Sequence, residues 1–591
     1  MMRLALAQLN PTVGDVVGNT RLVLQAIDQA RSDGAEVLVA GELGLIGYPP
    51  RDLLFRAGVV EACEQAVGEI ARHAGDLLVI VGHPRRCPGG TRPLRNSVSV
   101  CRAGKVVAVY DKRLLPGYDV FDEDRYFDPG DQPCVVEAAG GRLGLLICED
   151  LWRAEDVRTE RSYPIDPVQE TAALGCDVLL SLNANPFVLG KWQRHLEQLR
   201  AAATRHKLPI VAVQQVGAND DLIFDGRSVV VAADGSIAAI LPGWRPALET
   251  IELPDNAHGV HAVGWDHVRT DPMEELWNAL VLGVNDYCRK SFNDKVIIGL
   301  SGGIDSAVTA CIAAAAVGPD NVLGVMMPSR YSPAASLEDA RELAANLALP
   351  GCQTVPIEST HLAVQDALAA SLREQAGGVT DENIQARLRG LLLMAFANAT
   401  GAFVLAPGNK SELASGYCTI YGDMCGALAV LGDVVKTRVY ALARWINAHH
   451  VDCGFAQPPI PQRSLTRPPS AELRPHQLDQ DTLPPYETLD LIVERYIELE
   501  QSVPQIIGET DIEAQLVRET VSMIDRAQYK RDQAALILKV TARTFGRGRP
   551  MPIAMRWTEA MSYEPRAIGE SPQIAPGLPG GECASAESEP S

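Results

Sequence analysis

The chain lacks several features that would place it in a special class of protein. Its 13 cysteines form no CxxC pair, and several, such as Cys148, Cys288 and Cys311, lie in apolar segments. We therefore expect free thiols in a reducing cytoplasm. No segment has the roughly eighteen consecutive apolar residues that cross a bilayer, and the first residues have no basic start followed by an apolar run. We expect a cytoplasmic protein without a membrane partner.

Positive charge is also scarce. The sequence has 53 Lys and Arg against 74 Asp and Glu, which gives a net charge of -21. Such a charge repels phosphate backbones, so we expect no nucleic-acid partner and disfavour a tRNA-modifying enzyme, which would need a basic face. A polyphosphate ligand would have to be met by local lysine, arginine and metal. The composition, 47% hydrophobic, is that of an ordinary soluble enzyme.

Internal repeats are absent, and 591 residues are too many for one core, so we expect two or three domains. The stretch 254–272 breaks both the strand and the helix periodicity and is the predicted boundary. The end of the chain loses apolar periodicity and gains Pro, Gly, Glu and Ser, which predicts a disordered tail. The predicted divisions are a first domain 1–258, a linker 259–272, a second domain 273–560 and a tail 561–591.

The first domain alternates short apolar strands with amphipathic helices, for example a strand over 36–43 and a helix over 191–206. Strands that are apolar on both sides indicate a sheet covered by helices. Three polar residues stand where such strands stop, namely Glu42, Lys112 and Cys148. We expect these three side chains to converge at one edge of a sheet.

A thiol beside a carboxylate and an ammonium group forms a nucleophile set. Glu42 would take the proton of Cys148, and Lys112 would stabilise the thiolate and the oxyanion formed when an amide carbonyl is attacked. Taken singly, each residue has a plainer interpretation. A cysteine that ends an apolar strand is usually core filler, and a lone Glu or Lys there is usually solvated.

Three segments, GELGLIGYPPRDLL, YDKRLLPGYDVFDEDRYF and GLLICEDLW, together resemble the catalytic segments of the nitrilase superfamily. The resemblance implies a four-layer αββα domain that hydrolyses carbon-nitrogen bonds. It assigns Glu42 as the general base, Lys112 as the stabilising lysine and Cys148 as the nucleophile. It also assigns Glu123 as a second glutamate that holds the lysine and the substrate amide.

LPGYDVFDE and CEDLW are similar to the glutaminase branch of that superfamily. This implies that Tyr118, Phe121 and Glu149 recognise glutamine, and a carboxylate at Glu149 suits an α-ammonium group. Asn185 stands where the family often has serine, and we keep it as a glutamine contact. Lys191 is the candidate for binding the glutamine carboxylate.

The second domain opens with KVIIGLSGGIDSAV, a buried strand that runs directly into a Gly-rich turn. The amides of Gly302 and Gly303, the hydroxyls of Ser301 and Ser306 and the start of a helix near Asp305 would surround a phosphate. The loop is not a Walker loop, because GxxxxGK[ST] is absent. Asp305 beside phosphate oxygens requires a divalent cation. The plainer alternative is a Gly-rich strand-to-helix turn without a ligand.

Alternating strands and helices after this loop predict a doubly wound parallel sheet with ligands at the carboxyl ends of its strands. SGGxDS resembles the loop of the N-type ATP pyrophosphatases. SGGIDSA, MPSRYS, ENIQARLRG, GNKSELASGYCTIYGD and PPSAELRP together resemble an NAD synthetase domain, and residues 3–558 resemble the glutamine-dependent NAD synthetase family. This implies that ATP adenylates deamido-NAD on its nicotinate carboxylate and that ammonia then displaces AMP.

The resemblance also implies a set of ligand-binding residues. Asp305 and Glu412 would hold Mg²⁺. Lys436 and Thr437 would join the loop residues in binding ATP. The deamido-NAD contacts would be Asn383, Arg387, Arg389, Glu412, Asp423 and Lys530. Arg387 and Arg389 are two residues apart and cannot face the same side of a helix, so only one is expected to reach the ligand.

Two further stretches are expected to act on the nucleotides. Residues 457–485 are rich in Pro and polar side chains and too long for a connector, which suggests a mobile lid carrying Glu472, Asp479 and Asp481. Lys530, Arg531 and Lys539 form a predicted basic patch for the deamido-NAD phosphates, with a solvated helix face as the alternative.

Two other functions remain open. One is a stand-alone carbon-nitrogen amide hydrolase with a degenerate nucleotide domain. The other is a nucleotide-sensing protein without turnover, which the complete Glu, Lys and Cys set disfavours, because a sensor needs no nucleophile. The resemblance further implies small-molecule substrates and at least a homodimer through the synthetase domains.

Overall fold

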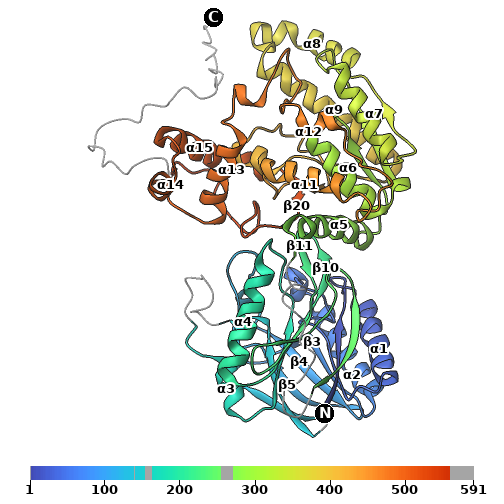
Figure 1. Cartoon of the computed structure of the whole chain (residues 1–591), viewed down its shortest axis with the longest axis vertical. Coiled ribbons are helices and arrows are strands. Elements are labelled where there is room, and N and C mark those ends of the chain that lie inside the picture. The colour runs from blue at the N-terminus through green and yellow to red at the C-terminus, as the bar shows by residue number, and fades with distance from the viewer. Residues whose placement is uncertain (1, 139, 153–162, 254–269, 559–591) are drawn as a thin grey trace, which may run out of the picture.

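The structure is a computed structural model that describes residues 2–138, 140–152, 163–253 and 270–558. Its two bodies lie end to end, with the first part of the chain below and the second above in Figure 1. The predicted tail and most of the predicted linker lie outside the described residues. Within the described part, no helix is long and apolar enough to span a bilayer.

The first body is built on two six-stranded sheets. One has the order β14 (Ala247–Leu253), β1 (Met2–Gln8), β2 (Val37–Val39), β3 (Leu78–Arg86), β4 (Leu94–Arg102) and β5 (Lys105–Asp111). The other has the order β13 (Ile237–Ile240), β12 (Val229–Val231), β9 (Ile210–Gln214), β8 (Val178–Asn183), β7 (Gly141–Ile147) and β6 (Cys134–Ala138).

These sheets pack face to face, and helices cover both outer faces. Helices α1 (Val16–Ser32) and α2 (Ala57–Ala74) share a core with the first sheet. Helices α3 (Pro167–Ala173) and α4 (Lys191–His206) share one with the second sheet. A third core lies between the sheets, because their central strands are buried on both faces. The predicted αββα architecture is confirmed.

One predicted strand of this body is wrong. The run PIVAVQQVG (209–217) has the apolar pattern that predicts a single strand, but it forms β9 and then β10 (Val216–Asn219), which pairs with β11 (Leu222–Asp225) as a separate hairpin. The chain bends here because Gly217 adopts a φ of 109°, which the central strands of a sheet do not use. The bend carries the hairpin toward the second body (Figure 1).

The second body is a six-stranded parallel sheet with helices on both faces, as predicted. Its order is β17 (Gln353–Thr354), β16 (Val322–Met326), β15 (Val296–Gly299), β18 (Phe403–Ala406), β19 (Leu428–Ala429) and β20 (Leu536–Ile537). The larger core of this body joins one face to α5 (Pro272–Lys290), α6 (Ile304–Val317), α7 (Ala334–Asn346) and α11 (Lys436–Ala448). The opposite face packs against α9 (Val379–Thr400).

The remaining helices lie around this sheet. They are α8 (Glu358–Leu372), α10 (Lys410–Ser415), α12 (Gln462–Thr466), α13 (Tyr486–Val493), α14 (Val503–Glu509), α15 (Ala514–Arg526) and α16 (Gln528–Arg531). The helix expected over 486–500 is α13 followed by a π-helical turn, η8 (Glu494–Glu498). Residues 467–485 contain no α-helix and lie over the carboxyl ends of the strands beside the cavity described below.

Helix α5 and the β10–β11 hairpin join the two bodies (Figure 1). The ammonium group of Lys290 donates to Asn10 Oδ1 at 2.7 Å, Pro11 O at 2.9 Å, Ala218 O at 2.8 Å and Asn219 Oδ1 at 2.8 Å, all in the first body. These hydrogen bonds fix the end of α5 on the hairpin.

A second contact between the bodies follows β20. The backbone N–H of Lys539 donates to Asp221 O at 2.8 Å, and the buried ammonium group of the same residue lies 3.1 Å from Asp119 Oδ2. Nearby, Leu189 N donates to Val540 O at 2.9 Å. The two bodies are therefore connected by side-chain and backbone hydrogen bonds at two places.

Candidate functional site

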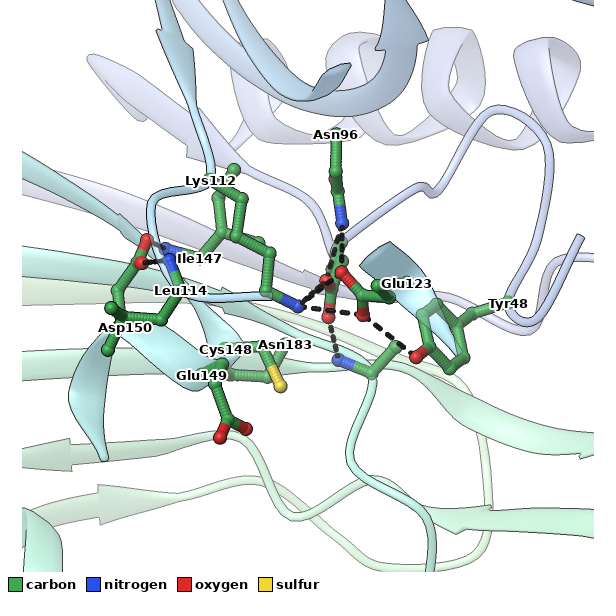
Figure 2. A network of polar contacts seen from close by, with 12 residues as sticks. Tyr48, Asn96, Lys112, Leu114, Glu123, Ile147, Cys148, Glu149, Asp150 and Asn183 are labelled. Carbon is green, nitrogen blue, oxygen red and sulfur yellow. Dashed lines mark hydrogen bonds and ion pairs between the residues drawn. The ribbon is translucent and has the colours of Figure 1, made fainter. Parts of the chain in front are cut away.

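The buried ammonium group of Lys112 lies between two carboxylates in the first body (Figure 2). Its Nζ is 2.7 Å from Glu42 Oε1 and 2.8 and 2.9 Å from the two oxygens of Glu123. Glu42 follows β2, Lys112 follows β5, and Glu123 begins a short helical turn, η2 (Glu123–Arg125). The structure thus brings together the Lys and both Glu residues predicted from separate segments.

Other polar groups hold these carboxylates in place. Asn96 Nδ2 donates to Glu42 Oε1 at 2.8 Å, and Ala184 N donates to Glu42 Oε2 at 3.2 Å. Tyr48 Oη donates to Glu123 Oε1 at 2.9 Å. Sequence reasoning missed Asn96 and Tyr48. Asn96 lies in β4, whose sequence LRNSVSVCR carries several polar residues, so no local signal distinguished it.

Cys148 stands at the sharp turn between β7 and the helical turn η3 (Cys148–Leu151), with a φ of 42° in the left-handed region. Such a backbone costs about 1 kcal/mol or more for a residue other than glycine and is frequent at catalytic positions. Burial, and then the charge of Glu42, raise the pKa of the thiol well above its usual range, while Lys112 lowers it. The resting group is therefore a thiol, and its Sγ lies 3.1 Å from Asn185 Oδ1.

Glu149, next to the nucleophile, is buried and faces two phenols. Tyr118 Oη lies 3.2 and 3.1 Å from its two oxygens, and Tyr163 Oη donates to Oε1 at 2.9 Å. The ring of Phe121 packs edge-on against Tyr118 at 5.4 Å between centroids. Tyr163 was not predicted from the sequence, since it stands in no recognisable motif.

Asn185 and Lys191 line one small cavity with Trp192, His195 and Asp225. Burial lowers the pKa of Lys191, whose Nζ donates to Pro186 O at 3.4 Å. The side-chain nitrogen of Asn185 is buried and has no hydrogen-bond partner. An unpaired buried donor costs about 1–3 kcal/mol, so this wall of the cavity suits a ligand that supplies an acceptor.

The predicted phosphate loop lies between β15 and α6 at the carboxyl end of the second sheet. Gly302 has a φ of 79°, and a Cβ there would lie 2.2 Å from Ser336 O, so only glycine fits. Ser301 Oγ lies 3.1 Å from Ser306 Oγ, and Gly303 N donates to Ser301 Oγ at 3.2 Å. The loop is folded back on itself as a concave turn.

This loop forms one wall of a cavity of about 290 Å³. Most of the residues predicted for the second site line it, although they come from segments more than a hundred residues apart. They are Ser301, Gly302, Gly303, Asp305, Ser306, Arg389, Glu412, Asp423 and Lys436.

Lys436 bridges the two predicted magnesium ligands. Its Nζ is 2.5 Å from Asp305 Oδ2 and 3.2 Å from Glu412 Oε1, while Asn409 Nδ2 donates to Asp305 Oδ1 at 2.9 Å. Burial raises the pKa of Glu412 to about 8, although Lys436 opposes this. Paired carboxylates are the donors that Mg²⁺ prefers, so the residues fit this ion. Among the described residues, no group of three or more His, Cys, Asp or Glu could hold a metal.

Only one of the two neighbouring arginines of α9 faces this cavity. Arg389 is half-buried, its Nε donates to Met327 O at 3.1 Å, and burial lowers its pKa to about 10. Arg387 is exposed, and its Nε donates to Ile420 O at 3.2 Å. This agrees with the expectation that the two side chains point in different directions.

The other predicted contacts lie at the borders of the cavity. Asp423 accepts from Thr419 N at 2.7 Å, and burial raises its pKa to about 6. Asn383 Oδ1 accepts from Thr419 Oγ1 at 2.7 Å. Thr437 does not line the cavity, and its backbone N–H donates to Asp490 Oδ2 at 2.8 Å.

Two of the three predicted lid carboxylates reach the cavity. Glu472 and Asp479 line it, and Glu472 Oε1 accepts from Ser336 Oγ at 2.6 Å. Asp481 instead lies 3.1 Å from Arg474 on the exterior. The segment that carries Glu472 and Asp479 is thus held close to the phosphate loop.

The predicted basic patch is wrong for Arg531 and Lys539, and only Lys530 of the three is partly exposed. Arg531 and Lys539 are buried, and Arg531 donates to the backbone oxygens of Leu413 and Ala414. Lys530 donates to the backbone oxygen of Gly416 at 2.6 Å. The cationic groups of Arg531 and Lys530 donate to backbone carbonyls at the end of α10, because a buried charge needs several acceptors.

Comparisons with known proteins match both bodies. The family model described as carbon-nitrogen hydrolase matches residues 3–255, and the one described as NAD synthase matches residues 276–534. A glutamine-dependent NAD(+) synthetase from Synechocystis is 41% identical over 94% of this chain and 99% of its own length. One from Aquifex aeolicus is 38% identical over 94% and 100%.

Solved structures agree with these sequence matches. A glutamine-dependent NAD+ synthetase from Acinetobacter baumannii, in complex with ADP, is 36% identical, has a TM-score of 0.73 and matches over 93% of this chain and 98% of its own. One from Cytophaga hutchinsonii, 19% identical with a TM-score of 0.77, shares the fold over 93% of this chain and 97% of its own.

Proposed function

Because this chain belongs to the family of glutamine-dependent NAD(+) synthetases, we propose that its two sites perform successive halves of one reaction. The chain is an ATP-dependent ligase that takes nitrogen from glutamine. A stand-alone amide hydrolase with a degenerate nucleotide domain is disfavoured, since relatives match along 94% of the chain. The proposed parts are a glutaminase domain 1–258, a linker 259–272, a synthetase domain 273–560 and a tail 561–591.

In the first site, Cys148 attacks the side-chain amide of glutamine. Glu42 takes the thiol proton and delivers it to the departing ammonia, and a thioester remains. Lys112, held by Glu42 and Glu123, donates to the oxyanion of the tetrahedral intermediate. Water, deprotonated by Glu42, then releases glutamate.

The charges around the pocket suit the ends of glutamine. Glu149, held by Tyr118, would face the α-ammonium group, with Phe121 beside it. Lys191 would face the α-carboxylate, and the unpaired amide of Asn185 would donate to the substrate.

In the second site, the loop Ser301–Ser306 binds the ATP phosphates through backbone N–H groups and hydroxyls. Asp305 and Glu412 would hold Mg²⁺, which when bound neutralises the triphosphate. Lys436, which lies beside both carboxylates, would contact the phosphate oxygens, and Thr437 would support it. The nicotinate carboxylate displaces pyrophosphate and becomes an adenylate, and ammonia displaces AMP.

The deamido-NAD contacts are proposed from the walls of the same cavity. Arg389 lines this cavity and would meet a carboxylate or phosphate, and Asp423, which also lines it, would lie toward the nicotinate end. Asn383 and Lys530 would bind the remainder, as the family resemblance implies. We propose Arg387 as an outer contact only, because it points away from the cavity.

The observation that carries this proposal is the presence of a complete nucleophile set and a complete phosphate loop in one connected chain. The decisive experiment incubates the protein with deamido-NAD, ATP, magnesium and glutamine labelled with ¹⁵N in its amide. Mass spectrometry should find the label in NAD, with one glutamate per labelled molecule. Label that stays in free ammonium would overturn the proposed coupling.

A variant separates the two halves. Cys148→Ala should abolish glutamine-supported NAD formation and leave synthesis from ammonium chloride intact. Ammonia is mostly protonated at neutral pH and then cannot attack, so we also propose that it passes between the sites inside the molecule. Equal loss with both nitrogen donors would contradict this separation of roles.

We propose a homodimer through the synthetase domain, as the family resemblance implies. Helices α8 and α9 expose apolar side chains: Leu391 is 63% exposed and Val379 70%, together with Met394 and Leu362. Leu391 and Met394 are three residues apart on α9 and so share one face of the helix, and exposed apolar side chains on one face favour an interface. Sedimentation should give a dimer for the natural chain and a monomer for Leu391→Glu with Met394→Glu.

The compartment follows from the thiols. The cysteines of the described residues are all free. A chain with so many unpaired thiols is stable in a reducing environment, so we propose the cytoplasm.

A further inference from the structure

Asp150 is a buried carboxylate beside the first site that takes no part in the chemistry described above. It lies two residues after the nucleophile and is 1% exposed. Its Oδ1 accepts from Arg113 N at 3.0 Å and Leu114 N at 2.9 Å. Its Oδ2 accepts from Ile147 N at 2.9 Å and from Tyr110 Oη at 2.7 Å.

These four donors have a particular place in the sequence. Tyr110, Arg113 and Leu114 stand two before, one after and two after Lys112. Ile147 immediately precedes Cys148. One carboxylate therefore binds the chain on both sides of the lysine and the chain just before the nucleophile. Figure 2 shows Asp150 facing Leu114 and Ile147, with Lys112 and Cys148 beside them.

The two catalytic segments have no strand pairing in common. Lys112 follows β5, which is the edge of the first sheet, and Cys148 follows β7 of the second sheet. Hydrogen-bonded ladders fix positions within a sheet, whereas two packed sheets are held by side-chain packing. Asp150 supplies hydrogen bonds that run from one sheet to the other at the level of the reacting groups.

The chemistry requires such a connection. Lys112 must meet the oxyanion that forms when Cys148 attacks, and a displacement of about 1 Å costs about a hundredfold in rate. Cys148 also has a left-handed backbone, which persists only where its surroundings hold it. The Ile147 hydrogen bond acts on the residue next to that strained position.

We propose that Asp150 is a positioning residue that sets the separation of Lys112 from Cys148 across the two sheets. This inference rests on the proposed glutaminase function of the first site. Asp150 acts through the backbone of its neighbours and touches neither substrate nor reacting atoms. All four of its partners donate, so the ionised carboxylate is the form that satisfies them together.

Asp150→Asn tests this with little change in volume. The side chain of Asn has one oxygen and one NH₂ group. Whichever way it is turned, its NH₂ group faces at least one of the four donors that Asp150 accepts from. Tyr110 can turn its hydroxyl and accept, but Ile147 N–H cannot. We therefore expect the turn at Cys148 to shift, with a fall in kcat for glutamine of about a hundredfold and KM within about threefold. Synthesis from ammonium chloride should keep its wild-type rate.

A second readout reports the thiol without any turnover. The rate of alkylation of Cys148 by iodoacetamide, followed against pH, should fall about tenfold and its profile should move, because the thiol no longer meets Lys112 and Glu42 at the same distances. This measurement is independent of whether glutamine is the substrate. Failure of the proposed function would leave this change intact, whereas failure of the positioning role would abolish it.

Two further variants complete the test. Tyr110→Phe removes one of the four hydrogen bonds and leaves the fold close to the natural one, so a slower alkylation of Cys148 is expected even if Asp150→Asn does not fold.

Asp128→Asn is the matched control. It alters another buried aspartate, which accepts from Thr91 Oγ1 and Arg92 N, and it should leave alkylation unchanged. The inference would be overturned if alkylation and kcat stayed unchanged in both Asp150→Asn and Tyr110→Phe. It would also be overturned if Asp128→Asn slowed alkylation as much as these two variants do.

Discussion

A single ammonium group, that of Lys112, serves two carboxylates in the first site. Glu42 must accept a proton during the reaction, yet it shares this cation with Glu123. If Lys112 were paired with Glu42 alone, it would stabilise the ionised Glu42 and make it a weaker base. Glu123 therefore moderates the effect of the lysine as well as holding it in place.

Glu123→Gln should expose this role. The amide oxygen still accepts from Lys112, but the second negative charge is lost, and Glu42 becomes the sole counter-ion. We expect kcat for glutamine hydrolysis to fall about 10²- to 10³-fold, measured by glutamate release. Synthesis supported by ammonium chloride serves as the internal control and should not change. A kcat equal to that of the natural chain would show that the charge of Glu123 is not needed.

His195 gives the first body a pH-dependent stability. It is buried in α4, its Nε2 lies 3.1 Å from Gln214 Nε2, and burial, followed by the charge of Lys191, lowers its pKa to about 3. In the unfolded chain the pKa is about 6.5. The unfolded state therefore binds the proton first as the pH falls below about 6.5, and stability is lost from there toward about pH 3. At pH 5 the loss is about 2 kcal/mol.

His195→Gln keeps an acceptor for Gln214 and has no titrating group. The decrease in thermal midpoint between pH 7 and pH 5, followed by circular dichroism, should be smaller in this variant than in the natural chain. An equal decrease in His195→Gln and the natural chain would contradict the argument.

At this scale the sequence was informative where a residue stands at a strand end. The positions of Glu42, Lys112 and Cys148 were predictable because each follows an apolar run, and those of Gly302 and Asp305 because the loop has a fixed pattern. Asp150 and Tyr163 were not identified. Their roles depend on hydrogen bonds to segments far away in sequence, which no local pattern encodes.

Among the elements, α10 is held by a cation at its first turn. The ammonium group of Lys410 is fully buried and lies 2.9 Å from Asp433 Oδ1 and 2.7 Å from Glu498 Oε1, in η8. It also donates to Thr541 Oγ1 at 2.7 Å and Arg543 O at 2.8 Å, beyond β20. One side chain thus joins four segments that surround the second site.

Lys410→Met should destabilise the synthetase domain by about 3–5 kcal/mol, because it leaves two carboxylates without a buried counter-ion. The thermal midpoint of that domain measures this. Arg438→Met is the matched control, since the Arg438–Glu494 pair is partly exposed and contributes at most about 1 kcal/mol. If both variants melted at the same temperature, the buried cluster around Lys410 would stabilise the domain no more than the partly exposed Arg438–Glu494 pair does.

Elements with a strong periodicity were predicted well and the others were not. Helix α4 was expected over 191–206 and begins and ends there. The short strands β6 and β11–β14 were not predicted, because they are too brief or too polar to stand out, and their positions depend on pairing with distant strands. The spacing of apolar residues does not distinguish the π-helical turn after α13 from a continued α-helix, so this turn was not predicted.

For the whole molecule, the important feature is that the two sites lie in bodies connected at two places. The segment after β20 touches the loop that carries Tyr118 through the pair of Lys539 and Asp119. The end of α5 touches the β10–β11 hairpin through Lys290. The first contact joins residues 420 positions apart and the second joins residues 72 positions apart, so neither was predictable from local sequence patterns, although two domains were expected.

Lys290→Met tests whether the contact between the bodies matters for nitrogen transfer. The side chain of Lys290 is 9% exposed, and four oxygens of the first body would lose their donor. We expect glutamine hydrolysis and ammonium-supported synthesis to persist, each within about threefold, while the ratio of glutamate formed to NAD formed rises above one, because an altered junction releases ammonia to the solvent. Arg289→Met is the control. Arg289 is 55% exposed and pairs with Asp286 of its own helix, so its ratio should stay near that of the natural chain. A ratio near one in Lys290→Met, with both half-reactions intact, would mean that transfer does not depend on Lys290 and that the remaining contacts of α5, those of Asp286 and Glu275 with the first body, align the two bodies together with the contact after β20.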